Sequence, residues 1–357
     1  MYSTTPVNHE WVKEITLRML IEARVKVRLN TQLFAVQNDG AKINSIFFGN
    51  KTGTDNCEAD IFIDATGDGD LAVLSGVPYE IGRKPDGLLQ PSSMLFKAGG
   101  VDLNHFMDSP GGLHCARAKV PGSDREEVVW FAATTTPWNE VIEEKGFFIG
   151  KNREWWGNSM RKGEANVNAS RIHMHDSTDP EQNASAMIEG RMQAHQMMAF
   201  LTGNCPGWED AYFMSMAPFV GVRESRRTLG EYVLTGDDVH SGRRFDDVVA
   251  RLGYPLDIHS PTGTGIEFRG ITGRGTYDFP YRSLLPKNIE NLLTAGRCVS
   301  ATHEAHAAIR PMIQCMAIGQ AAGVGAAIAA RKNKSPKEID IKQVQEVLLS
   351  QNAKLDI

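Results

Sequence analysis

Four side chains that could bind an anion or move a proton lie close together near the C-terminal end of this sequence: His303, Glu304, His306 and Arg310. Residues 291–295 read as a buried strand before them, and Gly296 reads as a turn. A polar loop carrying the four side chains should follow, and then a long helix rich in Ala and Gly with Pro311 in its first turn. A helix start offers free N–H groups and a partial positive charge. The segment therefore predicts a site for something anionic or electron-rich, and the alternative is a helix docked on a sheet in any α/β protein.

Three arginines occupy five positions farther back in the chain, at Arg223, Arg226 and Arg227. A guanidinium group can hold a carboxylate through two parallel hydrogen bonds, and Arg223 is our best candidate for that role. The alternative is a structural ion-pair network with the nearby acidic residues Glu224, Glu231 and Asp237.

Histidines supply the candidates for acid–base chemistry, because imidazole titrates near neutral pH. His303 is one candidate, and His259, which follows the strand-like run at 254–258, is another; ordinary structural histidines are the alternative for both. The H-E-A-H spacing at 303–306 is not the zinc spacing H-E-x-x-H. His173 and His175 stand two positions apart, but we can place no third ligand beside them. We predict no metal site.

Composition excludes several classes of protein. The net charge is −5 and the isoelectric point is about 6.1, which argues against nucleic-acid binding. The first twenty residues show no signal peptide, and the run at 312–330 is interrupted by Gln314 and Gln320, so we expect no membrane span. Five isolated cysteines without a C-x-x-C pair support neither zinc nor an iron–sulfur cluster and fit a reducing cytoplasm.

A second segment, ADIFIDATGDGDLA at 59–72, has the features of a buried strand followed by a glycine turn. It satisfies the loose dinucleotide pattern G-x-G-x-x-A. We do not interpret it as a phosphate loop, because Gly76 and Pro78 follow too soon for the crossover helix of a βαβ unit.

The segment instead resembles the internal A-T-G motif of flavoproteins with two dinucleotide folds. Together with AGRCVSATHEA and IRPMIQCMAIGQAAG it resembles the FAD-dependent oxidoreductase family related to the flavoprotein subunit of heterodisulfide reductases. GVRESRRTLGEYVLTGDDV, YPLDIH and FPYRSLLPKNIENLL fit the same family, so the resemblance runs from about residue 8 to 331. It implies FAD as the cofactor, with contacts from Ala65, Thr66, Gly67, Gly296, Arg297, Arg310, Met312 and Ile313. It also implies catalytic roles for Arg223, His259, His303 and Arg310.

One departure from the family concerns the start of the chain. Family members open with a strand, a glycine-rich turn and a helix that hold the FAD pyrophosphate, and nothing before Asp60 has that pattern. Residues 8–23 read instead as a helix, followed by two strands joined at Asn38-Asp39-Gly40. We expect an N-terminally truncated flavoprotein that by itself binds FAD weakly.

The resemblance implies an α/β fold of the two-dinucleotide, glutathione-reductase-like type, incomplete at the N-terminus. We expect an FAD-binding lobe built from residues 1–84 and 281–334, an inserted α+β substrate lobe at 85–280, and a tail at 335–357. The predicted function is FAD-dependent oxidation or reduction of a small organic substrate in the cytoplasm. Two alternatives stay open. One is a flavin-deficient fragment or subunit that needs a partner or a missing segment. The other is an electron-transfer subunit working with iron–sulfur partners. A homo-oligomer is a further option.

Overall fold

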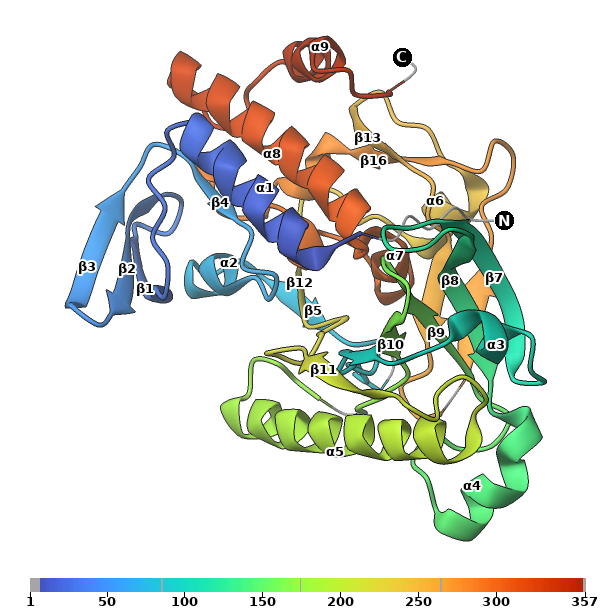
Figure 1. The fold of residues 1–357 in the computed structure, drawn as a ribbon. Helices are drawn as coiled ribbons and strands as arrows, with labels where there is room; N and C mark the ends of the chain where they lie inside the picture. The colour runs from blue at the N-terminus through green and yellow to red at the C-terminus, as the bar shows by residue number, and fades with distance from the viewer. Residues whose placement is uncertain (1–6, 85, 174, 264, 356–357) are drawn as a thin grey trace. The chain divides into compact units, whose positions relative to one another are not determined.

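The computed structural model describes residues 7–84, 86–173, 175–263 and 265–355. The chain forms a mixed α/β structure of two compact units, whose elements Figure 1 labels. Unit 1 contains residues 1–27, 91–175 and 179–222, and unit 2 contains residues 28–90, 176–178 and 223–357.

Unit 1 is built on a six-stranded antiparallel sheet in the order β11-β6-β10-β9-β8-β7. Its strands are β6 (Phe96–Gly99), β7 (Gly112–Lys119), β8 (Glu126–Thr134), β9 (Glu154–Asn158), β10 (Glu164–Asn168) and β11 (Tyr212–Met216). Its helices are α1 (His9–Glu22), α3 (Leu103–Met107), α4 (Asn139–Lys145) and α5 (Pro180–Asn204), with a 3₁₀ turn at Thr136–Trp138.

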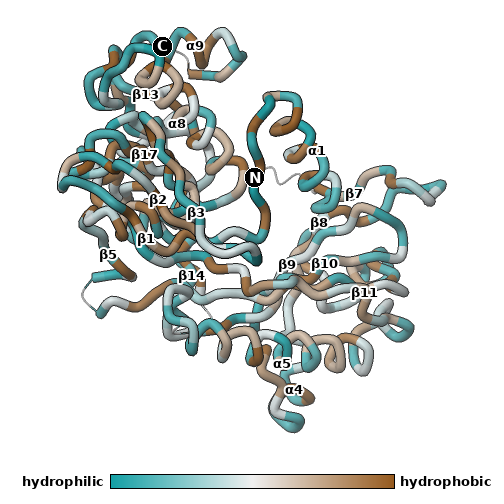
Figure 2. The backbone as a smooth tube through the Cα atoms, turned by 90° about the vertical axis from the view of Figure 1, so that its left-hand side faces the viewer, coloured by the Kyte–Doolittle hydropathy of each residue, from teal (hydrophilic) through white to brown (hydrophobic). Residues whose placement is uncertain are grey.

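Helix α5 covers one face of this sheet. It starts where Asp179 accepts hydrogen bonds from the N–H groups of Glu181 and Gln182, with Pro180 in its first turn. Side chains from alternate strand positions, such as Phe96, Ala98, Ala165 and Val167, pack with apolar residues of α5 into one core. The intervening strand residues therefore lie on the opposite face. Helix α1 buries none of its residues, and Figure 2 shows apolar positions along it.

Unit 2 has one three-stranded meander and several two-stranded pairs. Its strands are β1 (Gln32–Asn38), β2 (Ile43–Asn50), β3 (Gly53–Glu58), β4 (Phe62–Asp64), β5 (Tyr79–Ile81), β12 (Arg226–Thr228), β13 (Val248–Leu252), β14 (Leu256–His259), β15 (Ile266–Arg269), β16 (Tyr277–Pro280) and β17 (Leu292–Thr294). Its helices are α2 (Asp70–Leu74), α6 (Gly236–Ser241), α7 (His303–Ile309), α8 (Met312–Lys332) and α9 (Ile341–Ser350), with 3₁₀ turns at Tyr281–Leu284 and Gly296–Cys298.

Strands β4 and β17 form the centre of unit 2. They pair in parallel, with Ile63 opposite Leu293. Phe62 joins a small core with residues of α2 and the meander, whereas Leu293 joins the main core with residues of α8. The pair is thus flanked by α2 on one face and by α8 on the other.

Most of the expected elements are present, with shifted ends. The first helix is α1, the hairpin at Asn38-Asp39-Gly40 joins β1 to β2, and the helix α2 after the glycine turn is only five residues long. The expected loop at 303–310 is wrong, because residues 303–309 form helix α7. The Thr302 hydroxyl accepts a hydrogen bond from the Ala305 N–H at its start, and three alanines favour the helix.

The compact units group the chain differently from the expected lobes. Residues 223–280 belong to the same unit as 281–334, and residues 1–27 belong to the unit that holds most of the expected insertion. Which part binds a cofactor and which a substrate stays a prediction.

Candidate functional site

The turn after β4 is fixed by one buried carboxylate. Asp64 accepts hydrogen bonds from the Thr66 N–H at 3.0 Å, the Thr66 hydroxyl at 2.7 Å and the Ala72 N–H at 2.8 Å. The last bond ties strand β4 to helix α2. Ala65, Thr66 and Gly67, which were predicted to contact a cofactor, therefore lie in a turn that one side chain holds in shape.

Gly67 lies directly against a predicted cofactor-binding arginine. Its φ is +85°, which favours glycine, and a Cβ placed on it would be 2.7 Å from Nη2 of Arg297. Nη2 of Arg297 also pairs with Oδ1 of Asp68 at 2.9 Å. Gly296 has φ +81° and open space where a Cβ would be. The structure thus brings Gly67, Gly296 and Arg297 together, with the guanidinium of Arg297 covering Gly67.

Sequence reasoning missed the acidic residues of this turn. Nε of Arg226 donates to the Asp68 carbonyl at 2.7 Å, and its guanidinium also pairs with Asp70. Burial raises the pKa of Asp70, although the charge of Arg226 opposes that shift. The sequence held one signal for these contacts: two aspartates alternate with glycines in GDGD, and three arginines lie elsewhere in the chain.

The arginine cluster at 223–227 divides into different roles. Arg227 is 2% exposed and donates to the carbonyls of Ala301 at 3.0 Å and Gly82 at 2.8 Å. It also pairs with Glu224. The structural ion-pair network offered as an alternative therefore exists, but it is built on Glu224. Glu231 pairs instead with Lys337, and Asp237 with Arg269.

Glu224 joins this network to His303 of α7. Nδ1 of His303 lies 2.9 Å from the Glu224 carboxylate, and both side chains are buried. Burial alone would raise the pKa of Glu224, but the hydrogen bond from His303 and the charge of Arg227 help to hold it below its usual value. Glu224 is therefore an anion enclosed by partners, and His303 lies inside the fold.

His306 is fully buried next to this network. Burial lowers its pKa to about 3, so it is neutral at physiological pH. Neither of its ring nitrogens has a hydrogen-bond partner within the described part of the chain, and the same is true of Nε2 of His303. Buried polar nitrogens are normally bonded, so this region is suited to ordered water or a polar ligand.

A second polar cluster forms around Asp257 and contains two predicted catalytic residues. Nε2 of His259 lies 3.5 Å from Asp257, and Nη2 of Arg310 lies 3.5 Å from the same carboxylate and 3.2 Å from the Asp257 carbonyl. The Tyr254 hydroxyl donates to Asp257 at 3.0 Å.

These contacts set the charge state of the second cluster. Burial lowers the pKa of His259 to about 4, partly offset by the hydrogen bond to Asp257, while the charges of Arg223 and Arg310 lower it further. Burial would raise the pKa of Asp257, but its bond to His259 and the charge of Arg310 bring it to about 2. A neutral imidazole and a carboxylate therefore lie close to each other, and the charges of Arg223 and Arg310 act on the imidazole.

Arg310 does not adopt the extended conformation that the following proline favours. It ends α7 in a helical conformation, with its N–H bonded to the His306 carbonyl at 3.1 Å. Pro311 is the residue before helix α8 rather than part of its first turn. The predicted contacts Met312 and Ile313 are the first two residues of α8 and are 50% and 68% exposed.

Two further predictions concern metals and membranes. Among the described residues, no group of three or more His, Cys, Asp or Glu side chains is arranged to hold a metal ion. By length and composition alone, α8 could cross a membrane. Ile318, Ala321 and Ala322 of this helix belong to the main core of unit 2, and 33% of its apolar window is buried.

A family model described as FAD dependent oxidoreductase matches residues 1–348 of this sequence. The chain belongs to this family. Membership makes FAD the expected cofactor and oxidoreduction the expected class of reaction. Among curated proteins, none matches the chain.

Several solved structures of flavoenzyme type are similar at low identity. A geranylgeranyl bacteriochlorophyll reductase-like protein from Thermoplasma acidophilum is 11% identical, with a TM-score of 0.45 over 98% of this chain and 62% of its own. The myxobacterial chondrochloren halogenase CndH is 11% identical, with a TM-score of 0.45 over 96% of this chain and 55% of its own. A triple mutant of the flavin-dependent brominase Bmp2 is 10% identical, with a TM-score of 0.44 over 96% and 60%.

These similarities are too distant to assign an activity, since all three TM-scores lie below 0.5. The chain spans only 55% to 62% of the length of these proteins.

The residues of unit 2 fit FAD at one place and compete with it at another. The start of α8 has no side-chain cap, so its first N–H groups can donate to the electron-rich edge of a flavin. The space beside Gly67, in contrast, holds the guanidinium of Arg297. A cofactor passing Gly67 would have to contact or displace this arginine.

Proposed function

We propose that this chain acts as an FAD-dependent oxidoreductase on a small organic substrate, with the flavin held by unit 2. The observation that carries the proposal is the start of α8 without a side-chain cap, which follows Arg310 and Pro311 in a chain of this family. A helix start and a cation both favour negative charge nearby. The glycine turns at Gly67 and Gly296 in the same unit support it.

Cofactor binding would involve the residues named from the sequence. Ala65, Thr66 and Gly67 would let the backbone pass close to the cofactor, and Arg297 would exchange its contact with Asp68 for one with an anionic group. The N–H groups of Met312 and Ile313 would face the flavin ring. When bound, FAD supplies the electron-transfer chemistry.

Substrate handling would rest on the cluster around Asp257. Arg223 would orient an anionic or polar substrate group. His259, neutral because of its lowered pKa of about 4, would accept a proton, and Asp257 would stabilise the resulting cation. His303, held by Glu224, would serve as a second proton-handling group.

A second candidate function is that of a subunit completed by another polypeptide segment. Its support is the apolar surface of unit 2: Met312, Ile313 and Met316 are each at least 50% exposed, and Ile63 of β4 is 39% exposed. Among the described strands, β4 pairs only with β17, so each strand of this pair has one edge without a partner strand.

Flavin retention tests both candidates. The first candidate predicts that the chain as given retains FAD. The second predicts weak retention, since α2 after the Gly67–Gly69 turn is only five residues long and offers a short helix start for a diphosphate. The chain is compared with a version extended by its upstream reading frame, and bound flavin is measured by absorbance after gel filtration.

If only the extended chain retains stoichiometric flavin, the result supports the second candidate. If the chain as given retains it, the result supports the first. Failure of both to retain FAD would refute a flavoprotein function.

A further inference from the structure

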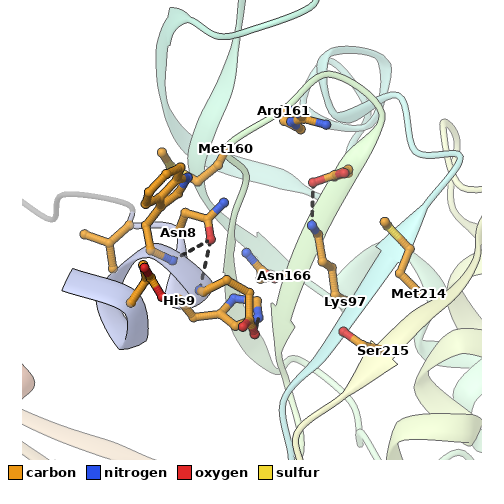
Figure 3. Close-up of a pocket in the computed structure, with 13 residues that line it drawn as sticks. Asn8, His9, Lys97, Met160, Arg161, Asn166, Met214 and Ser215 are labelled. Atoms are coloured by element: carbon orange, nitrogen blue, oxygen red, sulfur yellow. Dashed lines mark hydrogen bonds and ion pairs between the residues drawn. The ribbon is translucent and has the colours of Figure 1, made fainter. Parts of the chain in front are cut away.

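Unit 1 contains a cavity of about 660 Å³ on the sheet face that α5 does not cover. Figure 3 shows its residues, which come from the start of α1, from strands β6, β10 and β11, and from the turn before β10. This volume lies in the range of small-molecule sites.

The floor of the cavity continues into a row of polar side chains that crosses the sheet. Ser215 of β11 lies opposite Lys97 of β6, and Lys97 lies opposite Asn166 of β10. Asn166 in turn lies opposite Asn158 of β9, which lies opposite Trp130 of β8. Directly paired residues point to the same face, so one end of the row lines the cavity and the other ends at an aromatic ring.

The asparagines in this row are unusual for strands. Asn158, Asn166 and Asn168 alternate with buried residues on β9 and β10, although asparagine is depleted in strands. The amide of Asn166 donates to the Asn158 side chain at 2.8 Å, which gives the pair a structural role. A strand face turned to solvent does not require asparagine. Residues that go against the preference of their secondary structure are found at functional sites, so these asparagines indicate a binding face.

Most charges around the cavity are paired, but Arg161, which also lines it, forms no ion pair within the described part of the chain. Nζ of Lys97 contacts Glu164 at 2.6 Å on the floor. On α1, Glu10 pairs with Lys13 at 2.8 Å, and Glu14 pairs with Arg18 at 2.7 Å. A strongly charged ligand would gain little at the floor, because its charge would have to compete with the Lys97–Glu164 pair.

The walls supply apolar surface. Trp11 is 60% exposed and Met214 is 44% exposed, and Met160 completes this part of the lining. Aromatic and thioether side chains offer flat or adaptable contact to a ring. The amides and the Lys97–Glu164 pair both donate and accept hydrogen bonds, as a hydroxyl group does.

We propose that this cavity binds a neutral, hydroxyl-rich ring compound of the sugar or polyol class. The floor formed by Lys97, Glu164 and Asn166 bonds the hydroxyl groups, and Trp11 and the methionines cover the apolar face of the ring. The binding requires no flavin and stands apart from the proposed redox chemistry.

Calorimetric titration of the full chain without added FAD tests this site. The probes are methyl β-D-glucopyranoside and cellobiose, compared with gluconate, glucosamine and cyclohexanol. We expect saturable binding of at least one neutral sugar, and binding at least tenfold weaker for each of the other three compounds.

Variants connect the binding to the cavity. Asn166→Ala and Lys97→Met should each weaken the dissociation constant for the neutral sugar at least tenfold. Asn183→Ala at an exposed position of α5 and Lys119→Met at an exposed position of β7 are the matched controls and should leave it unchanged. Circular dichroism and thermal melting verify that each variant is folded.

Two outcomes would overturn the proposal. One is the absence of saturable binding by either neutral sugar, or tighter binding of gluconate or glucosamine. The other is equal sugar binding by the Asn166→Ala and Lys97→Met variants and their controls. Failure here would leave the flavin proposal standing, since FAD retention is measured separately.

Discussion

Ion pairs occur in both units, but water reaches them very differently. In unit 2, Arg227 and Glu224 are 2% and 0% exposed, and each has further partners. In unit 1, Lys97 and Glu164 are 23% and 17% exposed at the floor of a cavity. A buried charge that loses its partner keeps its full desolvation cost, whereas a cavity charge can turn to water or a ligand. The first arrangement fixes a fold, and the second leaves groups available for binding.

The sharpest test of this comparison removes one cation from each pair. Arg227→Met should lower the free energy of unfolding by about 3–5 kcal/mol, because Glu224 would remain charged and buried. Lys97→Met should lower it by at most about 1 kcal/mol, because Glu164 can be hydrated. Urea unfolding of both variants measures the difference. Equal losses would show that the two regions do not differ in this way.

Acid should affect unit 2 through its buried histidines. The pKa values of His259 and His306 are lowered from 6.5 to about 4 and about 3, so the folded chain binds fewer protons than the unfolded chain. Their contribution to stability is present above pH 6.5 and is lost as the pH falls from 6.5 towards 4.

At up to about 1.4 kcal/mol per pH unit for each group, we expect each histidine to contribute a loss of about 2–3 kcal/mol over this range. Unfolding measured at several pH values should show it. The variant His306→Leu should flatten the pH dependence, whereas His9→Gln on exposed α1 should not. An unchanged slope in His306→Leu would contradict the prediction.

Two glycines of unit 2 separate backbone strain from the contact with Arg297. Gly67 and Gly76 have φ values of +85° and +88°, but only Gly67 has Arg297 in the way of a Cβ. Each change to Ala should cost about 1–2 kcal/mol from the left-handed backbone.

In a flavin-competent form, only Gly67→Ala should also weaken FAD retention, because it displaces Arg297. Gel filtration with absorbance detection measures the retained flavin. Equal retention by the Gly67 and Gly76 variants would make Gly67 only a turn residue.

The smallest expected effect concerns Arg310. Asp257 already balances part of its charge, so Arg310→Met should lower the reduction potential of the flavin-loaded protein by the equivalent of only about 1 kcal/mol. Single-turnover reduction should slow accordingly. A potential equal to that of the unchanged chain, with lower thermal stability, would make Arg310 structural.

Local patterns predicted much of the fold. The turn at Asn38-Asp39-Gly40, the first helix and helix α8 are present because turn residues, capping residues and apolar spacing act over a few positions. Helix α7 was missed because its polar residues were interpreted as a loop, whereas His303 and His306 are buried in a helix.

The candidate site could be predicted only in part. Residue types and the resemblance together named Arg223, His259, His303 and Arg310, and all four lie in unit 2. It did not name Glu224, Asp257 or Asp68, whose contacts set the charge of those residues. The role of Asp257 could not be predicted, because the sequence does not show whether an aspartate is exposed or surrounded by cations.

The sequence by itself determined the family, the turn and helix signals, and the residue types available for chemistry, because these depend on short segments and on motif order. Only the tertiary structure decided which charges meet. Glu224 and His303 are 79 positions apart in the chain, and so are in contact only after folding. The same holds for Lys97, Asn166 and Ser215, which share one face of the sheet because strand pairing sets their register. Burial and pairing decide pKa values and binding, and both are properties of the folded chain.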